Sequence, residues 1–281
     1  MIKLILSGDD FGLHSSINEA IEDAYRNGVL TSASLVANGE KFDEAVRIIK
    51  RNPGLGVGLH FTLDSEAPAA PPAKIHTLLN SRGLLLDRND FLKKILLKQI
   101  KQEHIVLELE SQIQRFFDSG INFTHFDGHG HIHLFPPVFN LIKDILCKYN
   151  ITKMRYINIP WFGFRDKQLF KMFAAFFFKT YALIKKRKYK HPDYFLGFYD
   201  TGNIDFKKFL FWLKRIKKNG TYEFCFHPGK NDAVIAKKYE KWNQYFPYLF
   251  SWEKDFLSLT DLNVKKNIKS SSLKLINYKN I

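Results

Sequence analysis

The chain has 281 residues, of which 45% are hydrophobic and 15% aromatic, so it can bury one barrel-sized core or two smaller ones. It has no Ser/Gly linker, internal repeat or long low-complexity tract, which favours a single domain over residues 1–281. Cys147 and Cys225 lie in helical and strand patterns and predict two buried thiols, not a disulfide, in a reducing compartment. The chain starts directly with a strand pattern, so we expect no signal peptide and a cytoplasmic location.

Strand and helix patterns alternate from residue 1 to about residue 226. Strands are expected near residues 2–7, 29–37, 55–60, 121–127, 152–158, 194–199 and 221–226. Helices are expected at Ser15–Asn27, Lys41–Asn52, Asn89–Ser119, Pro136–Tyr149, Asp166–Tyr189 and Asp205–Asn219. Such β/α repeats imply a parallel sheet, and we predict an α/β fold, a modified (β/α) TIM-like barrel. The Pro/Ala stretch Ala67–Ala73 predicts a long loop over its site.

Polar side chains follow four of the predicted strands. Asp9 and Asp10 follow the first, His60 the third, a histidine run the fourth and His227 the last. In (β/α) barrels the carboxyl ends of the strands meet at one pole and carry the active site. Each group alone has an ordinary explanation, because Asp-Asp can cap a helix and His-Pro-Gly can form a turn. Their repeated position favours one shared site.

The histidine run contains four of the chain's ten histidines within nine residues, at His125, His129, His131 and His133, with Asp127 among them. Imidazole is the commonest metal ligand, and a carboxylate adds an oxygen donor. Gly128 and Gly130 predict that the strand ends and a loop begins within the run. In an extended chain His129 and His133 would lie about 13 Å apart, so we expect one or two ligands from the run. A surface tract that binds nickel-type ions adventitiously is the alternative.

These groups suit hydrolysis of an amide or ester. One carboxylate and two histidines leave positions on a divalent ion for water and substrate. A second carboxylate can take the water's proton, and the Asp9-Asp10 pair supplies one. His227 is placed to protonate the leaving amine or stabilise the oxyanion.

The net charge of +15 is unevenly distributed. Residues 1–140 carry 14 Lys+Arg against 17 Asp+Glu, whereas residues 141–281 carry 29 against 11. Within the basic half, the Phe-rich segment Lys167–Lys190 has an apolar part that is shorter than the roughly 20 residues a membrane span needs. It predicts either an interfacial helix on anionic lipid or a barrel helix with solvated lysines. It could also serve a homodimer, and we expect no nucleic-acid partner, because no such motif occurs.

The sequence contains the motifs Asp9-Asp10-Phe11-Gly12, Gly28–Val36 with its Thr31-Ser32, Gly56-Val-Gly-Leu-His60, Thr124–Pro136 and His227-Pro228-Gly229. Together these motifs resemble the YdjC/ChbG family of carbohydrate deacetylases, from about residue 3 to residue 260. The departures from the family pattern are Gly128, where many relatives have Ser, and Ser7-Gly8, where the family often has Asn-Ala.

The resemblance implies a modified (β/α) barrel that removes N-acetyl groups from amino sugars with one divalent metal ion. By position, the metal ligands would be Asp10, His60 and His129, the general base Asp9, and the acid or oxyanion partner His227. Zinc, nickel, cobalt and manganese suit these ligands better than magnesium does. The groups expected to face the substrate or to orient the ligands are Asp127, His131, His133 and Arg155.

The substrate stays open at this point between two classes of amino sugar. An N-acetylhexosamine linked to a polyprenyl phosphate, of the kind used in lipid A modification, suits the basic half and the Phe-rich segment, and would bring peripheral contact with an anionic membrane. Soluble chitooligosaccharides are the alternative, and a metal-bearing sugar or lipid binder without catalysis is a third. The Asp9 carboxylate argues against the binder, because binding alone does not need it.

Overall fold

A computed structural model describes residues 1–160, 189–240 and 249–281 of the chain. The expected helix Asp166–Tyr189 and the segment Lys167–Lys190 lie almost wholly outside the described residues.

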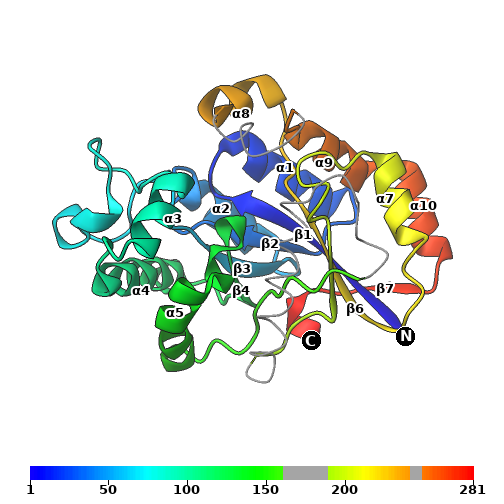
Figure 1. Ribbon diagram of the computed structural model, residues 1–281. Coiled ribbons are helices and arrows are strands. Elements are labelled where there is room, and N and C mark those ends of the chain that lie inside the picture. The colour runs from blue at the N-terminus through cyan, green and yellow to red at the C-terminus, as the bar shows by residue number, and fades with distance from the viewer. Residues whose placement is uncertain (161–188, 241–248) are drawn as a thin grey trace.

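A curled parallel sheet forms the centre of the fold (Figure 1), with strand order β4-β3-β2-β1-β6-β5. β7 pairs in parallel with Ile2–Leu4 at the start of β1. β2 pairs with the other end of β1, from Ser7 to Phe11. All the strand pairs are parallel, as the β/α alternation predicts. The strands are β1 (Ile2–Phe11), β2 (Ser32–Leu35), β3 (Gly56–Phe61), β4 (Phe126–Gly128), β5 (Tyr194–Leu196), β6 (Gly220–Phe226) and β7 (Leu273–Leu275).

The expected strand at 152–158 is not a regular strand, yet it occupies the gap between β4 and β5. On one side, Phe126 N–H donates to the Lys153 carbonyl and Arg155 N–H donates to the Phe126 carbonyl, both at 3.0 Å. On the other side, Phe195 N–H donates to the Asn158 carbonyl at 2.9 Å. An isolated bridge to β4 and this hydrogen bond to β5 thus join the two edges of the sheet and give it the form of a TIM-like barrel, as predicted.

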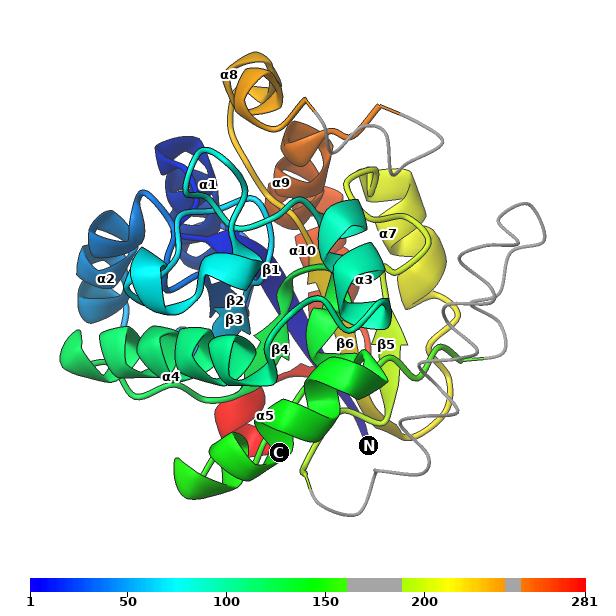
Figure 2. The ribbon, with the colours of Figure 1, turned by 60° about the vertical axis from the view of Figure 1, so that its left-hand side comes forward.

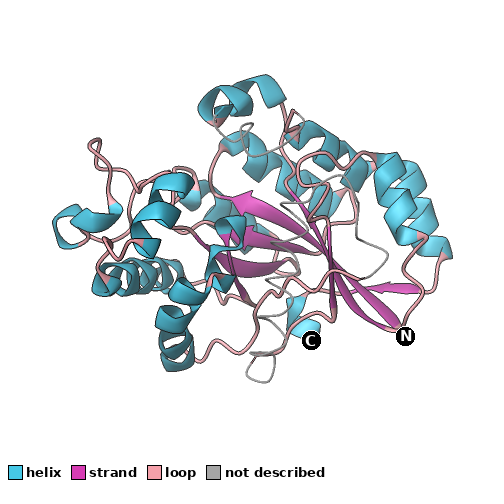
Figure 3. Ribbon diagram, in the orientation of Figure 1, coloured by secondary structure: helices cyan, strands magenta, loops and turns pink. Residues whose placement is uncertain are grey.

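Helices surround the sheet on its outer face (Figures 2 and 3). Their apolar stripes meet the outward side chains of the strands; α2, for example, buries Phe42, Ala45 and Ile49. The helices are α1 (Ser15–Arg26), α2 (Phe42–Arg51), α3 (Arg88–Leu96), α4 (Gln102–Asp118), α5 (Pro136–Lys148), α7 (Phe206–Leu213), α8 (Asp232–Lys238), α9 (Trp252–Thr260) and α10 (Leu262–Ser270).

The single helix expected at Asn89–Ser119 is wrong, because the chain breaks it into α3 and α4. Lys98 adopts a left-handed conformation with φ +57°. The Gln99 N–H donates to the Lys94 carbonyl at 2.8 Å, and the Lys98 N–H donates to the Ile95 carbonyl at 3.1 Å. This pair of bonds is a Schellman motif, which ends a helix and normally has glycine at the left-handed position. Because lysine takes that position here, within a run of helix-forming residues, the sequence does not reveal the break.

The two cysteines differ from each other in burial. Cys225 is buried on β6 as expected, but Cys147 is exposed on α5, so the prediction of a second buried thiol is wrong. Cys147 lies on the solvent side of an amphipathic helix whose buried positions are Val138, Phe139, Ile142, Ile145 and Leu146. Both thiols are free, as predicted.

Within the described residues, no helix is long and apolar enough to cross a membrane.

Alternate residues of each strand point into the barrel, and many of these inward side chains are polar. β1 contributes Ser7 and Asp9, and β6 contributes Glu223 and Cys225; all four are buried. Two inward positions of β3 are glycines. A Cβ at Gly58 would lie only 2.4–2.6 Å from three ring atoms of His125, so this glycine makes room for the side chain that enters the barrel just before β4.

We therefore expect Gly58→Ala to destabilise the fold by about 1–3 kcal/mol, because the added methyl group overpacks the barrel interior. Urea unfolding of the variant measures the change. In a His125→Ala background the added methyl group has space, and the same substitution should then cost much less. An equal cost in both backgrounds would contradict this explanation of the Gly-x-Gly-x-His pattern.

Candidate active site

Asp9 and Asp10, at the end of β1, both reach the carboxyl-end pole of the barrel. Asp9 follows the strand alternation and points inward. Asp10 has a left-handed backbone with φ +67°, and the pairing of β1 with β2 shifts register between Gly8 and Phe11. This bulge turns Asp10 so that neighbouring carboxylates serve one site, a common use of bulges next to active sites.

Asp10, His60 and His129 form a compact cluster. One side-chain donor atom from each residue lies within 4.8 Å of the others. Nδ1 of His129 is 3.0 Å from Oδ1 of Asp10, and Nε2 of His60 is 3.6 Å from the same oxygen. Since the three side chains come from the ends of β1, β3 and β4, the fold brings together the three residues that the sequence resemblance marks as metal ligands.

The donor set fits a divalent cation such as zinc. Oδ2 of Asp10 is buried and has no hydrogen-bond partner among the described residues, so an oxygen is left for an ion. Nδ1 of His60 lies 2.8 Å from Oδ1 of Asp127, an acceptor, so Nδ1 carries a proton, and Nε2 faces the cluster, where it would give its lone pair to a bound ion. A carboxylate behind a ligating histidine is the usual way in which proteins orient such a ligand.

The charges around His60 favour its protonated form in the metal-free protein. Burial lowers the pKa of His60, but the carboxylates of Asp127, Asp9 and Asp10 outweigh burial and raise it to about 9. Burial also raises the pKa of Asp10, but His129 and the other nearby histidines outweigh it and lower the pKa below its usual value. A cation at this site would replace the proton on His60.

Arg155 lies at the centre of the barrel and is fully buried. Its Nη1 donates to Oδ2 of Asp9 at 2.7 Å and its Nη2 to Oδ1 at 2.8 Å, a two-pronged pair. Nη1 is also 2.7 Å from Oδ2 of Asp127, and Nε donates to Oε1 of Glu223 at 2.9 Å. Burial raises the pKa of Asp9, but Arg155 outweighs it and holds that pKa well below the usual range. Asp9 is therefore ionised at neutral pH.

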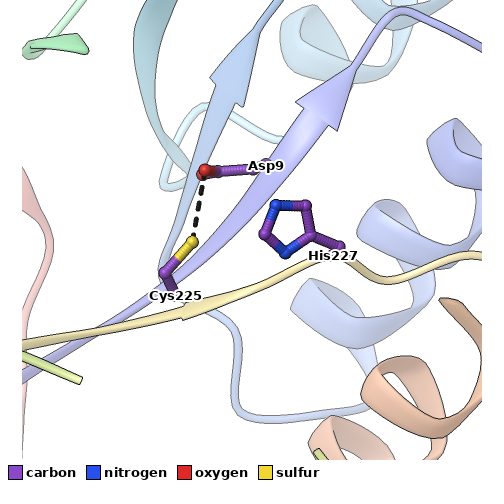
Figure 4. A group of neighbouring side chains, drawn as sticks. All are labelled: Asp9, Cys225 and His227. Carbon is purple, nitrogen blue, oxygen red and sulfur yellow. Dashed lines mark hydrogen bonds between the residues drawn. The ribbon is translucent and has the colours of Figure 1, made fainter. Parts of the chain in front are cut away.

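Cys225 and His227, at the end of β6, lie beside Asp9 (Figure 4). The Cys225 thiol donates to Oδ2 of Asp9 at 3.2 Å, and burial raises the pKa of this thiol well above its usual value. The backbone N–H of His227 donates to Asp255 on α9 at 2.8 Å. Nδ1 of His227 has no partner among the described residues, and burial lowers the ring's pKa, which leaves it neutral.

Asp9, Cys225 and His227 also lie close enough together to hold an ion. Both oxygens of Asp9 already accept from Arg155, and the thiol keeps its proton. This second group therefore suits a cation less well than the Asp10, His60 and His129 cluster does.

The histidine run contributes one residue to the cluster. After Gly128 the chain makes two 3-10 turns around Gly130 and His131, which have φ values of +54° and +59°. His133 turns away from the cluster, and its Nε2 lies 3.1 Å from the Arg155 carbonyl. His125 lies deeper in the barrel, next to Ser34. Burial lowers the pKa of His133 to about 4 and that of His125 to about 3, so both are neutral interior groups.

His131 lies against aromatic rings: its centroid is 5.5 Å from that of Phe195 and 5.6 Å from that of Phe198. Its role toward substrate stays a prediction.

The model of the family described as YdjC-like protein matches residues 3–270. The chain belongs to this family. A carbohydrate deacetylase from Clostridium beijerinckii is 27% identical over 280 residues, which span 100% of both chains. One from Thermoanaerobacter pseudethanolicus is 29% identical over 278 residues, which span 99% of this chain and 98% of that protein. A chitooligosaccharide deacetylase from Salmonella dublin is 37% identical over 155 residues, which span 53% of this chain and 57% of that protein.

A crystal structure also resembles this YdjC-like protein. The Enterococcus faecalis protein, named for cellobiose-phosphate cleavage, superposes with a TM-score of 0.77 and covers 99% of this chain and 98% of its own. The two sequences are 24% identical, so the likeness shows the common fold.

Sequence reasoning missed several residues of this YdjC-like site. Asp255 fixes the backbone at His227, and Ser34 donates to Oδ2 of Asp127 at 2.8 Å. Glu223 had a recognisable signal, because a charged residue at an inward position of an apolar strand is unusual. Glu66 lies in the loop after β3, where burial raises its pKa to about 7. No sequence pattern distinguishes a single acidic residue in a loop from an ordinary surface carboxylate.

The raised pKa of His60 predicts pH-dependent metal binding. Zinc must displace the proton of His60, so its apparent affinity for the metal-free protein should fall about tenfold for each pH unit below about 9. Competition with a chromophoric chelator at several pH values measures this slope. Asp127→Asn removes the nearest carboxylate, so the decline should begin at a lower pH than in the wild type. Identical profiles for the two proteins would contradict the assignment.

Removing Arg155 should leave the buried carboxylates of Asp9, Asp127 and Glu223 without their shared positive charge. We expect Arg155→Met to lower the free energy of unfolding by about 3–5 kcal/mol near neutral pH. The pKa values of Asp9 and Asp127 would rise above their unfolded values, so the deficit should shrink as the pH falls toward about 5. Chemical unfolding at two pH values tests this. Arg51→Met, which removes an exposed pair with Glu22, is the control and should change stability little at either pH.

Proposed function

We propose that this YdjC-like protein is a metal-dependent carbohydrate N-deacetylase that hydrolyses the acetamido group of an amino sugar. The observation that carries the proposal is the buried, ionised Asp9 beside the Asp10, His60 and His129 cluster. A site that only bound a metal or a sugar would not need this second carboxylate. The relatives named as carbohydrate and chitooligosaccharide deacetylases support the same reaction.

Asp10, His60 and His129 would hold the ion, which when bound polarises the substrate carbonyl and lowers the pKa of the attacking water. Asp9 accepts the proton of that water. Arg155 contributes by orientation, because its two bonds hold the Asp9 carboxylate in one plane. The neutral His227 ring donates an N–H hydrogen bond to the developing oxyanion, and the proton that Asp9 takes from the water passes to the leaving amine. Its backbone bond to Asp255 keeps the ring at the edge of the site.

Two classes of amino sugar remain candidates for the substrate. The relative from Salmonella dublin is named for chitooligosaccharides, which favours a soluble oligosaccharide. The excess of 29 Lys+Arg over 11 Asp+Glu in residues 141–281 favours a substrate that carries phosphate, such as a polyprenyl-phosphate-linked N-acetylhexosamine used in lipid A modification. The second substrate would also bring the protein into peripheral contact with an anionic membrane.

Acetate release tests the function and the substrate together. Purified protein, metal-free and zinc-loaded, is assayed in parallel with chitobiose and with a polyprenyl-phosphate N-acetylhexosamine. We expect release only after metal loading, and the preferred sugar identifies the substrate class. No release from either sugar would contradict the proposed deacetylase.

Asp9→Asn separates catalysis from binding. Loss of the base should lower kcat by about 10²–10⁴, while the variant should still bind zinc because the cluster of Asp10, His60 and His129 is intact. Glu110→Gln, which removes a surface carboxylate paired with Lys148, is the control and should keep full activity. An Asp9→Asn protein with unchanged acetate release would exclude Asp9 as the base.

A further inference from the structure

The last residues of the chain lie against the end of the barrel opposite the candidate site. After β7, Ile276 N–H donates to the Leu4 carbonyl at 3.0 Å, and Nδ2 of Asn277 donates to the Gly54 carbonyl at 3.0 Å. Nζ of Lys153 donates to the Tyr278 carbonyl at 2.6 Å. Figure 1 shows this segment in red beneath the strands. These bonds fix the backbone around Tyr278.

The Tyr278 side chain enters the barrel and is fully buried. Its ring stacks on His125, with 3.7 Å between centroids and 7° between planes. Its hydroxyl donates to Oε2 of Glu223. A phenol held by stacking on one face and by the hydrogen bond at its tip has one available position.

Glu223 accepts from two side chains, one on each oxygen. Oε1 accepts from Nε and Nη2 of Arg155, at 2.9 and 2.7 Å, and Oε2 accepts from Tyr278. Within the described residues no other side chain bonds to this carboxylate. Without the phenol, Oε2 would lack its partner, and the carboxylate could rotate about its terminal bond.

Arg155 transmits the position of Glu223 to Asp9. A guanidinium is planar and rigid, so its Nε edge, which contacts Glu223, and its Nη edge, which contacts Asp9, move together. A rotation of Glu223 would tilt the guanidinium and misalign the two bonds that hold Asp9.

We infer that Tyr278 is a positioning residue, which aligns the Asp9 carboxylate through Glu223 and Arg155. The inference rests on the proposed function in that Asp9 is taken as the base. Tyr278 itself touches no reacting atom and acts from the opposite end of the barrel.

Tyr278→Phe tests the inference, because it keeps the stacked ring and removes only the hydroxyl. We expect a fall of about tenfold in kcat with KM and zinc affinity unchanged, since substrate and metal contacts are intact. Tyr222→Phe is the matched control. It removes the hydroxyl of another buried tyrosine of the barrel, which donates to the Lys218 carbonyl on the outer side, and should leave kcat unchanged. A Tyr278→Phe protein with wild-type kcat overturns the inference.

A double-variant cycle distinguishes positioning from general loosening of the fold. Glu223→Gln should lower kcat by weakening the hold on Arg155. If Tyr278 acts through Glu223, Tyr278→Phe combined with Glu223→Gln should lose no more than Glu223→Gln alone. Multiplied losses would mean that Tyr278 acts by another route and would overturn the inference.

A crystal structure of Tyr278→Phe gives a readout that does not depend on turnover. We expect the two-pronged pair of Arg155 and Asp9, with 2.7 and 2.8 Å bonds in the wild type, to become one-pronged or longer. An unchanged pair overturns the positioning role even if the wild type proves inactive on every sugar. Inactive wild type together with a displaced pair would instead refute the deacetylase function alone.

Discussion

The rest of the structure depends on the buried guanidinium of Arg155. It is surrounded by the carboxylates of Asp9, Asp127 and Glu223, which could not stay ionised in a dry interior without a permanent positive charge among them. Arginine suits this position because it never loses its proton and its planar fork can bind carboxylates on several edges. Burying such a charge costs desolvation energy, but the bonds that it makes hold its partners in one arrangement. Here Arg155 orients three carboxylates at once: Asp9, which we propose as the base, Asp127, which pairs with His60, and Glu223, which accepts from Tyr278.

A polar barrel interior shifts the hydrophobic core outward. In this chain the large apolar side chains lie between the sheet and the surrounding helices, and the inside of the barrel holds serines, acids, histidines and the arginine. The cohesion of the fold and the chemistry of the site therefore reside on opposite faces of the same strands. Substitutions on the outward face should act through stability, and those on the inward face through the charge network.

Local patterns predict much of this fold. The alternation of β/α units and the polar residues at strand ends lead to the barrel and to the pole that carries the site, whereas the choice of Asp10, His60 and His129 as ligands came from the family resemblance. Elements that depend on long-range contacts are less predictable. The segment 152–158 is held by isolated bridges, the break at Lys98 uses a non-glycine left-handed residue, and α8, α9, α10 and β7 follow the last strand that the pattern predicts. The link from Tyr278 to Glu223 spans 55 residues and no local pattern marks it.

The position of Tyr278 in the chain has a consequence for the order of folding. Its partners His125 and Glu223 and their neighbour Arg155 all precede it in the sequence, so the polar interior cannot be completed until the ribosome has released residue 278. Contacts between residues far apart in the sequence form slowly, because the chain loses the entropy of closing the loop before it gains the free energy of the contact. During synthesis the barrel would pass through a stage in which its helices are packed and its buried charges still admit water. Full alignment of Asp9 by Arg155 and Glu223 would then follow the arrival of Tyr278.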